Sequence, residues 1–290
     1  MSIHSGTPRR RYAIITPSYA PDFERCRVLV ESARLHAADL DHYIVVEHRN
    51  QRLFAGLRGP RTHVVVTQDI LPWWLHQIPF RPKWWLNLRG LPVRAWIVQQ
   101  LVKLSADAIT DADGYVFIDS DAFLTKPFNP RAAERDGKTP MFREILPGET
   151  PSNSQWHEAA ARLLGRPVEP RYRTGYVGNI VRWERTNLKA LHRHIEQTTR
   201  RGWMDSLCRL DTMSEYVIYG MFCERVLREA SGHYFESTIP TLNYWGTAPL
   251  DLGALRDLRG QMRSEHIGVM ISAKSSTAVG SIRRAFEIAA

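Results

Sequence analysis

Two carboxylates one residue apart follow an apolar run that predicts a buried strand. Asp119-Ser120-Asp121 comes directly after Gly114–Ile118. Ligands of open α/β sheets bind outside the carboxyl ends of the strands, so the pair stands where chemistry is expected. Carboxylate oxygens suit hard divalent cations, which are commonly held by one or two carboxylates plus phosphate oxygens. The pair is therefore either a magnesium or manganese site or a solvated acidic turn.

Glu215 is the second acidic residue of interest, at the expected start of a helix over about 214–229. A carboxylate within hydrogen-bond reach can take the proton of an attacking hydroxyl group, which makes Glu215 a candidate base. Thr212-x-x-Glu215 also matches a capping box, in which the carboxylate only binds a backbone N–H. Glu215 is thus either a base or a cap, and Asp211 is the alternative base.

The elements that position these residues alternate between strand and helix. Three short β-branched runs predict strands that pair in parallel, and a fourth ends at the acidic pair; they cover residues 12–16, 43–47, 63–67 and 114–118. Helices are expected over residues 23–38, 93–108, 155–164 and 187–200, and further strands over 180–183 and 267–271. This order predicts an α/β protein with a mainly parallel sheet flanked by helices.

One polar residue, Gln100, lies on the apolar stripe of the helix expected over 93–108. It shares its face with residues such as Ile97 and Leu101. A buried amide needs hydrogen-bond partners, so Gln100, together with Gln99 and Lys103, either orients a loop or touches a ligand, or Gln100 is a satisfied structural amide. The preceding segment, residues 71–92, is rich in tryptophan and proline and predicts an irregular loop, whose aromatics serve either packing or sugar binding.

Composition and charge limit the possible classes of protein. The 290 residues are 43% hydrophobic and 24% charged, as in an ordinary globular protein. The net charge of +9 suits anionic partners such as nucleotide diphosphates or an anionic membrane surface. No nucleic-acid-binding module is recognisable, so no nucleic-acid partner is expected. The three cysteines show no metal-site spacing and predict reduced thiols in a cytoplasmic protein without a membrane-spanning segment.

We expect one domain over residues 1–290, because a single core can reach about this size. Its first half is expected over about 11–130 and a smaller, irregular second half over about 131–275; the resemblance given next implies nucleotide-sugar binding for the first and acceptor binding for the second. Residues 276–290 are expected to form a mobile tail.

Four segments together resemble a bacterial branch of GT-A-fold glycosyltransferases associated with surface polysaccharides. They are Ile15–Tyr19, Gln99–Leu104, Phe117–Asp121 and Ser214–Gly220, the last with the pattern Ser-Glu-Tyr-x-x-Tyr-Gly. The resemblance covers roughly residues 11–240 and implies a Rossmann-like GT-A fold with a metal-binding Asp-x-Asp motif.

The resemblance also implies roles for individual residues. The first strand and its turn, Thr16, Pro17, Ser18 and Tyr19, would contact the nucleotide. Ser120 would lie in the same donor site, Asp119 would face the ribose or the metal, and Asp121 would ligate the metal directly. His266 is the candidate for a histidine that completes the metal shell.

The predicted activity is metal-dependent transfer of a sugar from a nucleotide-sugar donor to a hydroxyl group. The transfer is expected to invert the anomeric centre, with a retaining route as the alternative if neither Glu215 nor Asp211 acts as a base. A UDP-sugar and manganese or magnesium are the expected donor and cofactor. By family analogy the acceptor is a saccharide or a lipid-linked glycan, reached by peripheral association with the inner face of the membrane. The alternatives are a glycan-binding protein without catalysis and a phosphatase-like hydrolase with an Asp-x-Asp motif.

Overall fold

The structure, a computed structural model, describes residues 10–288. At its centre lies a five-stranded sheet in the order β12-β7-β1-β2-β3, in which β12 alone runs antiparallel to its neighbour. Its strands are β1 (Tyr12–Pro17), β2 (Asp41–Val46), β3 (Thr62–Val66), β7 (Gly114–Phe117) and β12 (Val181–Glu184). The predicted α/β class, with a mainly parallel sheet flanked by helices, is confirmed.

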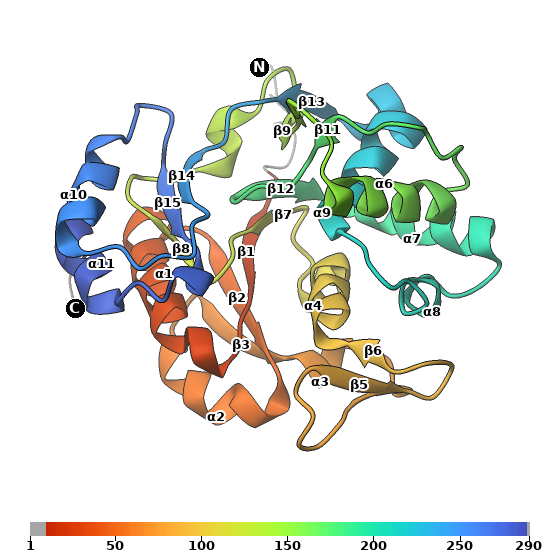
Figure 1. The fold of residues 1–290 in the computed structure, drawn as a ribbon, viewed down its shortest axis with the longest axis horizontal. Helices are drawn as coiled ribbons and strands as arrows, with labels where there is room; N and C mark the ends of the chain where they lie inside the picture. The colour runs from red at the N-terminus through yellow and green to blue at the C-terminus, as the bar shows by residue number, and fades with distance from the viewer. Residues whose placement is uncertain (1–9, 289–290) are drawn as a thin grey trace, which may run out of the picture.

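Both faces of this sheet are buried, as expected of a sheet built from parallel strands. Ile14 packs toward α1 (Phe23–His36), whereas Ile15 packs in the cluster that contains α4 (Ala95–Leu104), and neither side chain is exposed to solvent. The cluster that contains α4 also contains residues of three helices from the other half of the chain, α6 (Pro151–Leu163), α7 (Arg185–Thr199) and α9 (Glu215–Met221). Figure 1 shows α6 and α7 on the side of the sheet opposite α1.

A second, three-stranded sheet contains the strand expected over 267–271 and two strands that were not predicted. Its order is β14-β15-β8, and its strands are β8 (Ala122–Leu124), β14 (Thr241–Tyr244) and β15 (Gly268–Ile271). Two helices cover it, α10 (Leu252–Gly260) and α11 (Val279–Phe286). The expectation of a mobile tail over 276–290 is wrong for α11, because Ile282, Ala285 and Phe286 are buried in this layer; residues 289–290 lie outside the described range.

Residues 71–92 were expected to be irregular, and this prediction is also wrong. They contribute to a three-stranded antiparallel sheet in the order β4-β5-β6, with strands β4 (Leu75–Gln77), β5 (Trp84–Asn87) and β6 (Val93–Arg94). Trp74 and Trp85 are buried packing residues, whereas Trp73 and Trp84 are exposed. The prolines hid the alternation of inward and outward side chains along β5.

Short elements complete the description. They are the helices α2 (Gln51–Phe54), α3 (Thr67–Ile70), α5 (Ala106–Ile109) and α8 (Trp203–Leu207), the parallel pair β9 (Thr139–Phe142) and β13 (His233–Glu236), and the antiparallel pair β10 (Glu144–Ile145) and β11 (Thr174–Gly175). The helix expected over 214–229 ends at Met221 and continues as a π-helical segment, Phe222–Leu227. All three cysteines are buried free thiols. Within residues 10–288, every helix is too short or too polar to cross a lipid bilayer.

Candidate active site

Lys103 joins the acidic turn to the start of α9. Its ammonium nitrogen lies 2.8 Å from Asp119 Oδ1 and 3.0 Å from Glu215 Oε1, and it donates to the Tyr216 hydroxyl at 2.8 Å. The three N–H groups of the ammonium thus meet three oxygens, which is the full donor capacity of lysine. Four residues from α4, the end of β7 and α9 therefore form one cluster.

The charges of this cluster depend on one another. Burial lowers the pKa of Lys103, but the carboxylates of Asp119 and Glu215 outweigh this effect, and the pKa ends well above its ordinary value. The side chains of Lys103 and Glu215 are almost fully buried, whereas that of Asp119 is 37% exposed. Asp119 is therefore the member of the cluster that a ligand can reach.

The capping-box interpretation of Glu215 is wrong. Helix α9 begins at Glu215 itself, and Ser214 is the cap, whose hydroxyl accepts from the Val217 N–H. Thr212 instead accepts from the indole N–H of Trp156. The Glu215 carboxylate is thus free of a capping role and pairs with Lys103.

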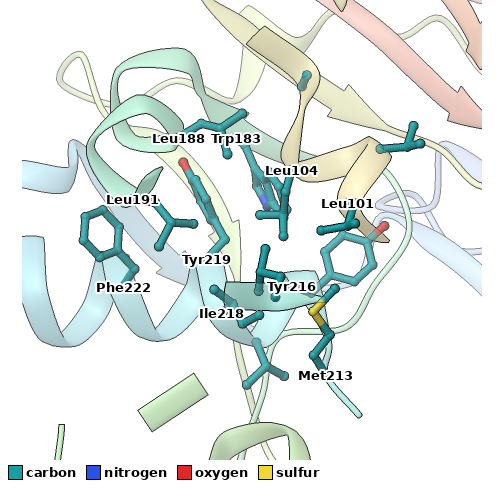
Figure 2. Close-up of a cluster of buried hydrophobic side chains, with 14 of the residues drawn as sticks. Leu101, Leu104, Trp183, Leu188, Leu191, Met213, Tyr216, Ile218, Tyr219 and Phe222 are labelled. Carbon is teal, nitrogen blue, oxygen red and sulfur yellow. The ribbon is translucent and has the colours of Figure 1, made fainter. Parts of the chain in front are cut away.

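Gln100 is buried and holds the first turn of α9 in place. Its Oε1 accepts from the backbone N–H of Glu215 at 2.9 Å, so the amide has a partner and acts on the site through Glu215. Figure 2 shows the apolar residues behind this contact: Leu101 and Leu104 of α4 lie beside Tyr216 and Tyr219 of α9, with Trp183 next to Tyr219. The Trp183 and Tyr219 rings are stacked, with centroids 4.3 Å apart. This packing fixes Glu215 relative to Lys103.

Asp121 lies beyond Asp119 on the other side of the turn. One carboxylate oxygen, Oδ2, accepts from the Ala273 N–H at 3.0 Å, which ties the turn to the loop after β15. Burial and then the neighbouring charge of Asp119 raise the pKa of Asp121 to about 6. A third carboxylate, that of Asp22, accepts from the Ser120 hydroxyl at 3.3 Å, and burial raises its pKa as well. Three carboxylates thus gather at this end of the sheet.

A cleft of about 950 Å³ lies at the same end of the central sheet as the acidic turn. Its walls are the turn after β1, the ends of β2 and β3, the β4–β6 sheet and α4; they include Pro17, Ser18, Tyr19, Glu47, Arg49, Lys83, Trp84, Arg94, Trp96 and Gln99. Asp119 and Asp121 are not among the residues that line it, but Tyr19 connects the two places. Burial and then the charges of Asp22 and Asp121 raise the pKa of Tyr19. The volume lies within the usual range for small-molecule sites.

Thr16 has a different role from the one predicted. Its side chain is fully buried, donates to the carbonyl of Ile118 at 2.8 Å and lies 2.9 Å from Nε2 of His42. Because the hydroxyl proton is used on Ile118, Nε2 of His42 must be the donor to Thr16. Thr16 thus links β1 to the end of β7, and the residues that face the cleft are Pro17, Ser18 and Tyr19.

Two predicted site residues lie away from the cluster. The backbone N–H of Thr125 donates to Ile267, whereas that of Ile271 donates to Asp121, so His266 is at the far end of β15 from the acidic pair. His266 instead accepts from the Arg263 N–H at 3.1 Å. Asp211 is exposed to solvent. The structure therefore does not bring His266 to Asp121, and it leaves Asp211 outside the buried charges around Lys103.

Two polar residues near the end of β7 were not predicted from the sequence. Asp22 follows the end of the first strand by only five residues, so its place in the sequence could have identified it as a site residue. Asn179 precedes β12, whose Val181 pairs with Phe117, so the chain reaches the sheet beside the acidic turn. Asn179 is buried, and its Oδ1 accepts no hydrogen bond from residues 10–288. No sequence signal distinguished Asn179 from an ordinary turn residue.

The acidic turn fits a divalent cation only together with a ligand. Within residues 10–288, no three histidine, cysteine, aspartate or glutamate side chains form a ready-made metal site. Asp119 and Asp121 each use one oxygen, on Lys103 and on Ala273 respectively. One or two carboxylates with phosphate oxygens suffice for magnesium, so the pair suits a cation that arrives with a phosphorylated ligand.

Comparisons with known proteins place the chain in a family. A family model matches residues 13–243. The chain belongs to DUF6492. DUF6492 is described as a family of unknown function, and its match spans β1 to β14, which includes Asp119, Asp121 and Glu215 but not β15 or α11. No curated protein matches the chain.

A solved structure has a similar overall arrangement. It is that of an active-site mutant of LgtC, with a TM-score of 0.47 and 13% sequence identity, and the alignment covers 95% of this chain and 94% of that chain. A likeness at this level establishes no shared activity for this DUF6492 protein, whose function must be argued from its own site.

Proposed function

We propose that this DUF6492 protein is a metal-dependent glycosyltransferase that moves a sugar from a nucleotide-sugar donor to a hydroxyl group of a saccharide or lipid-linked glycan. The observation that carries the proposal is the position of Asp119 and Asp121 at the end of β7, next to β1, whose following turn lines a cleft of about 950 Å³. Asp119 is held by Lys103 at 2.8 Å and remains partly exposed.

In this proposal Asp119 and Asp121 hold manganese or magnesium through the oxygens that Lys103 and Ala273 do not occupy. The cation would neutralise the charge that gathers on the departing diphosphate. Three cationic residues of the cleft, Arg49, Lys83 and Arg94, would attract the anionic donor. The exposed ring of Tyr19 offers a stacking surface for a uracil base, which fits a UDP-sugar.

Glu215 has two possible parts in the reaction. As a base it would accept the proton of the acceptor hydroxyl, and the prediction of inversion depends on this role. As a positioning residue it would act through Lys103 on Asp119. Its residue exposure of only 4% and its 3.0 Å contact with Lys103 support the positioning role.

Calorimetric titration with UDP, with and without manganese, tests the proposed donor site. We expect binding that requires manganese and that is lost in Asp121→Asn, because the amide cannot supply the anionic ligand. Asp257→Asn, on the exposed side of α10, is the matched control and should bind like the wild type. Absence of binding in the wild type, or manganese-dependent binding that Asp121→Asn retains, would remove the acidic turn from the proposal.

A further inference from the structure

An apolar surface projects from the molecule at the β4–β6 sheet. Of thirteen large apolar side chains exposed among residues 10–288, six lie between residues 73 and 91. They are Trp73 (73% exposed), Phe80 (101%), Trp84 (39%), Leu86 (43%), Leu88 (55%) and Leu91 (83%), and we call them the ribbon surface. Figure 1 shows the connections around β5 extending beyond α4 at the edge of the molecule.

The ribbon surface is not needed to hold the β4–β6 sheet in place. The inward face of this sheet carries Leu75, Trp85 and Val93, which are at most 3% exposed and belong to the main core cluster. Along β5 the outward positions are Trp84 and Leu86. Outward polar residues would leave the inward packing unchanged, so the apolar outward residues require another explanation.

The surroundings of the ribbon surface are purely cationic in sequence. No aspartate or glutamate occurs between Asp69 and Asp107, whereas Arg81, Lys83, Arg89 and Arg94 all lie in this interval and are exposed. The Arg94 guanidinium lies 5.9 Å from the centre of the Trp84 ring. Cations interleaved with exposed tryptophan and leucine match the two parts of a bilayer interface, its anionic head groups and its acyl chains.

Phe80 is the most exposed of these residues and stands between β4 and β5. Its φ of +60° is in the left-handed region, which is unfavourable for a bulky side chain. The turn therefore holds a phenylalanine out in solvent in a conformation that glycine or asparagine would adopt at lower cost. This is the position from which a side chain would enter a bilayer first.

We propose that the ribbon surface binds an anionic lipid bilayer, with Phe80 and Leu91 entering the acyl region and Arg81 and Lys83 contacting anionic head groups. Binding in this way requires neither a covalent lipid nor a spanning helix. Lys83, Trp84 and Arg94 also line the cleft, so docking would bring the mouth of the cleft toward the bilayer. The inference does not depend on the proposed sugar transfer.

Co-sedimentation with vesicles tests the proposal. The full chain should bind mixed phosphatidylcholine–phosphatidylglycerol vesicles far better than pure phosphatidylcholine vesicles, and added salt should weaken this binding. Phe80→Ser with Leu91→Ser, and separately Arg81→Glu with Lys83→Glu, should each weaken it by at least about tenfold. The matched control is Leu35→Ser with Ile145→Ser, two residues as exposed as Leu91 but far from it in sequence, which should bind like the wild type.

Thermal melting of each variant reveals a folding defect. Titration with UDP and manganese is made on the wild type, the control and Phe80→Ser with Leu91→Ser, so that a failure of the donor proposal is seen separately; Lys83 also lines the cleft, and its variant is left out of that titration. No sedimentation with anionic vesicles would overturn the inference. Equal binding by the control and both surface variants would do the same, because it would assign the attraction to the general positive charge. A wild-type dimer that Phe80→Ser with Leu91→Ser converts to a monomer, without vesicle binding, would assign the surface to a second copy of the chain.

Discussion

Lys103 makes the acidic turn and the start of α9 into one charged cluster. The ammonium group contacts Asp119 and Glu215 in a nearly solvent-free setting, where an unpaired charge is costly. Asp119 therefore cannot move independently of Glu215. The contact with Lys103 therefore fixes the orientation of the Asp119 carboxylate toward a bound cation or ribose.

The role of Glu215 can be separated by Glu215→Gln. We expect the affinity for UDP with manganese to fall by about tenfold together with turnover, because a weakened hold on Lys103 disturbs Asp119. The affinity is measured by calorimetry, and kcat and KM are measured with a donor found by screening nucleotide-sugars. A fall in kcat of about 10²–10⁴-fold with unchanged UDP affinity would instead establish Glu215 as the base.

His42 makes the stability of the protein depend on pH. Burial, then the charges of Arg34 and His63, lower the pKa of His42 to about 3, so the folded protein holds it neutral. The unfolded chain binds the proton near pH 6.5, and the stability contributed by His42 is therefore complete above that pH and is lost as the pH falls toward 3. Between pH 7 and pH 5 the wild type should lose about 2 kcal/mol more unfolding free energy than His42→Gln.

Urea unfolding at the two pH values measures this difference. Glutamine can still donate to Thr16 but does not titrate, which makes His42→Gln the matched comparison. An equal loss in both proteins would show that His42 does not carry the effect.

The sequence predicted the chemistry of these residues better than their roles. Gln100, Lys103, Asp119 and Glu215 were all recognised, and the structure brings them together across three elements. Thr16 and His266 failed for geometric reasons: one side chain points into the core, and the other lies at the wrong end of a strand. Neither fact can be read from sequence spacing. The direction of Thr16 depends on how β1 pairs with β2, and the position of His266 depends on how β15 pairs with β8, a strand distant in the chain.

At the scale of elements, Gly268 shows how closely β15 approaches β8. A Cβ added at Gly268 would lie 2.7 Å from the carbonyl oxygen of Phe123, a backbone atom that cannot rotate away. Gly268→Ala should therefore lower the free energy of unfolding by about 1–3 kcal/mol. It should also weaken binding of UDP with manganese, because β15 leads to the Ala273 N–H that holds Asp121.

Denaturant unfolding and calorimetry measure the two effects. The control is Gly260→Ala at the end of α10, where an added Cβ meets nothing within 4 Å. That variant should keep its stability or gain up to about 1 kcal/mol. Unaltered stability in Gly268→Ala would mean that the two strands can separate slightly without cost.

The strands of the central sheet were predictable because β-branched runs bounded by polar residues have few other interpretations. Residues 71–92 were not, since four tryptophans and several prolines conceal the two-residue alternation that β5 shows once its inward Trp85 and outward Trp84 are known. The strand over 267–271 was predicted and corresponds to β15, but the layer around it was not. Its other strands, β8 and β14, are short, and β15 pairs with β8, a strand distant in sequence, so no local pattern indicated the sheet.

At the scale of the whole molecule, α11 closes the layer that covers β8 and β15. The Phe286 ring meets that of Phe123 edge to face, with centroids 5.1 Å apart, and it is 9% exposed. Phe286→Ala should lower the free energy of unfolding by about 3 kcal/mol, within the usual range for a buried phenylalanine. Leu35→Ala, at a position 75% exposed, should change it by less than about 0.5 kcal/mol. Equal effects of the two substitutions in urea unfolding would show that residues 279–286 are only a loosely attached tail.

The acidic turn is also the point where the chain leaves one sheet for another. Asp119 follows β7 of the five-stranded sheet, and Asp121 precedes β8 of the three-stranded sheet. A cation held by both residues would connect the two layers, which also share an apolar cluster that contains Ile118, Ala122 and Met270. Removal of the cation by a chelator should then speed hydrogen exchange in β15, a strand that ends some 150 residues after Asp121 in the chain.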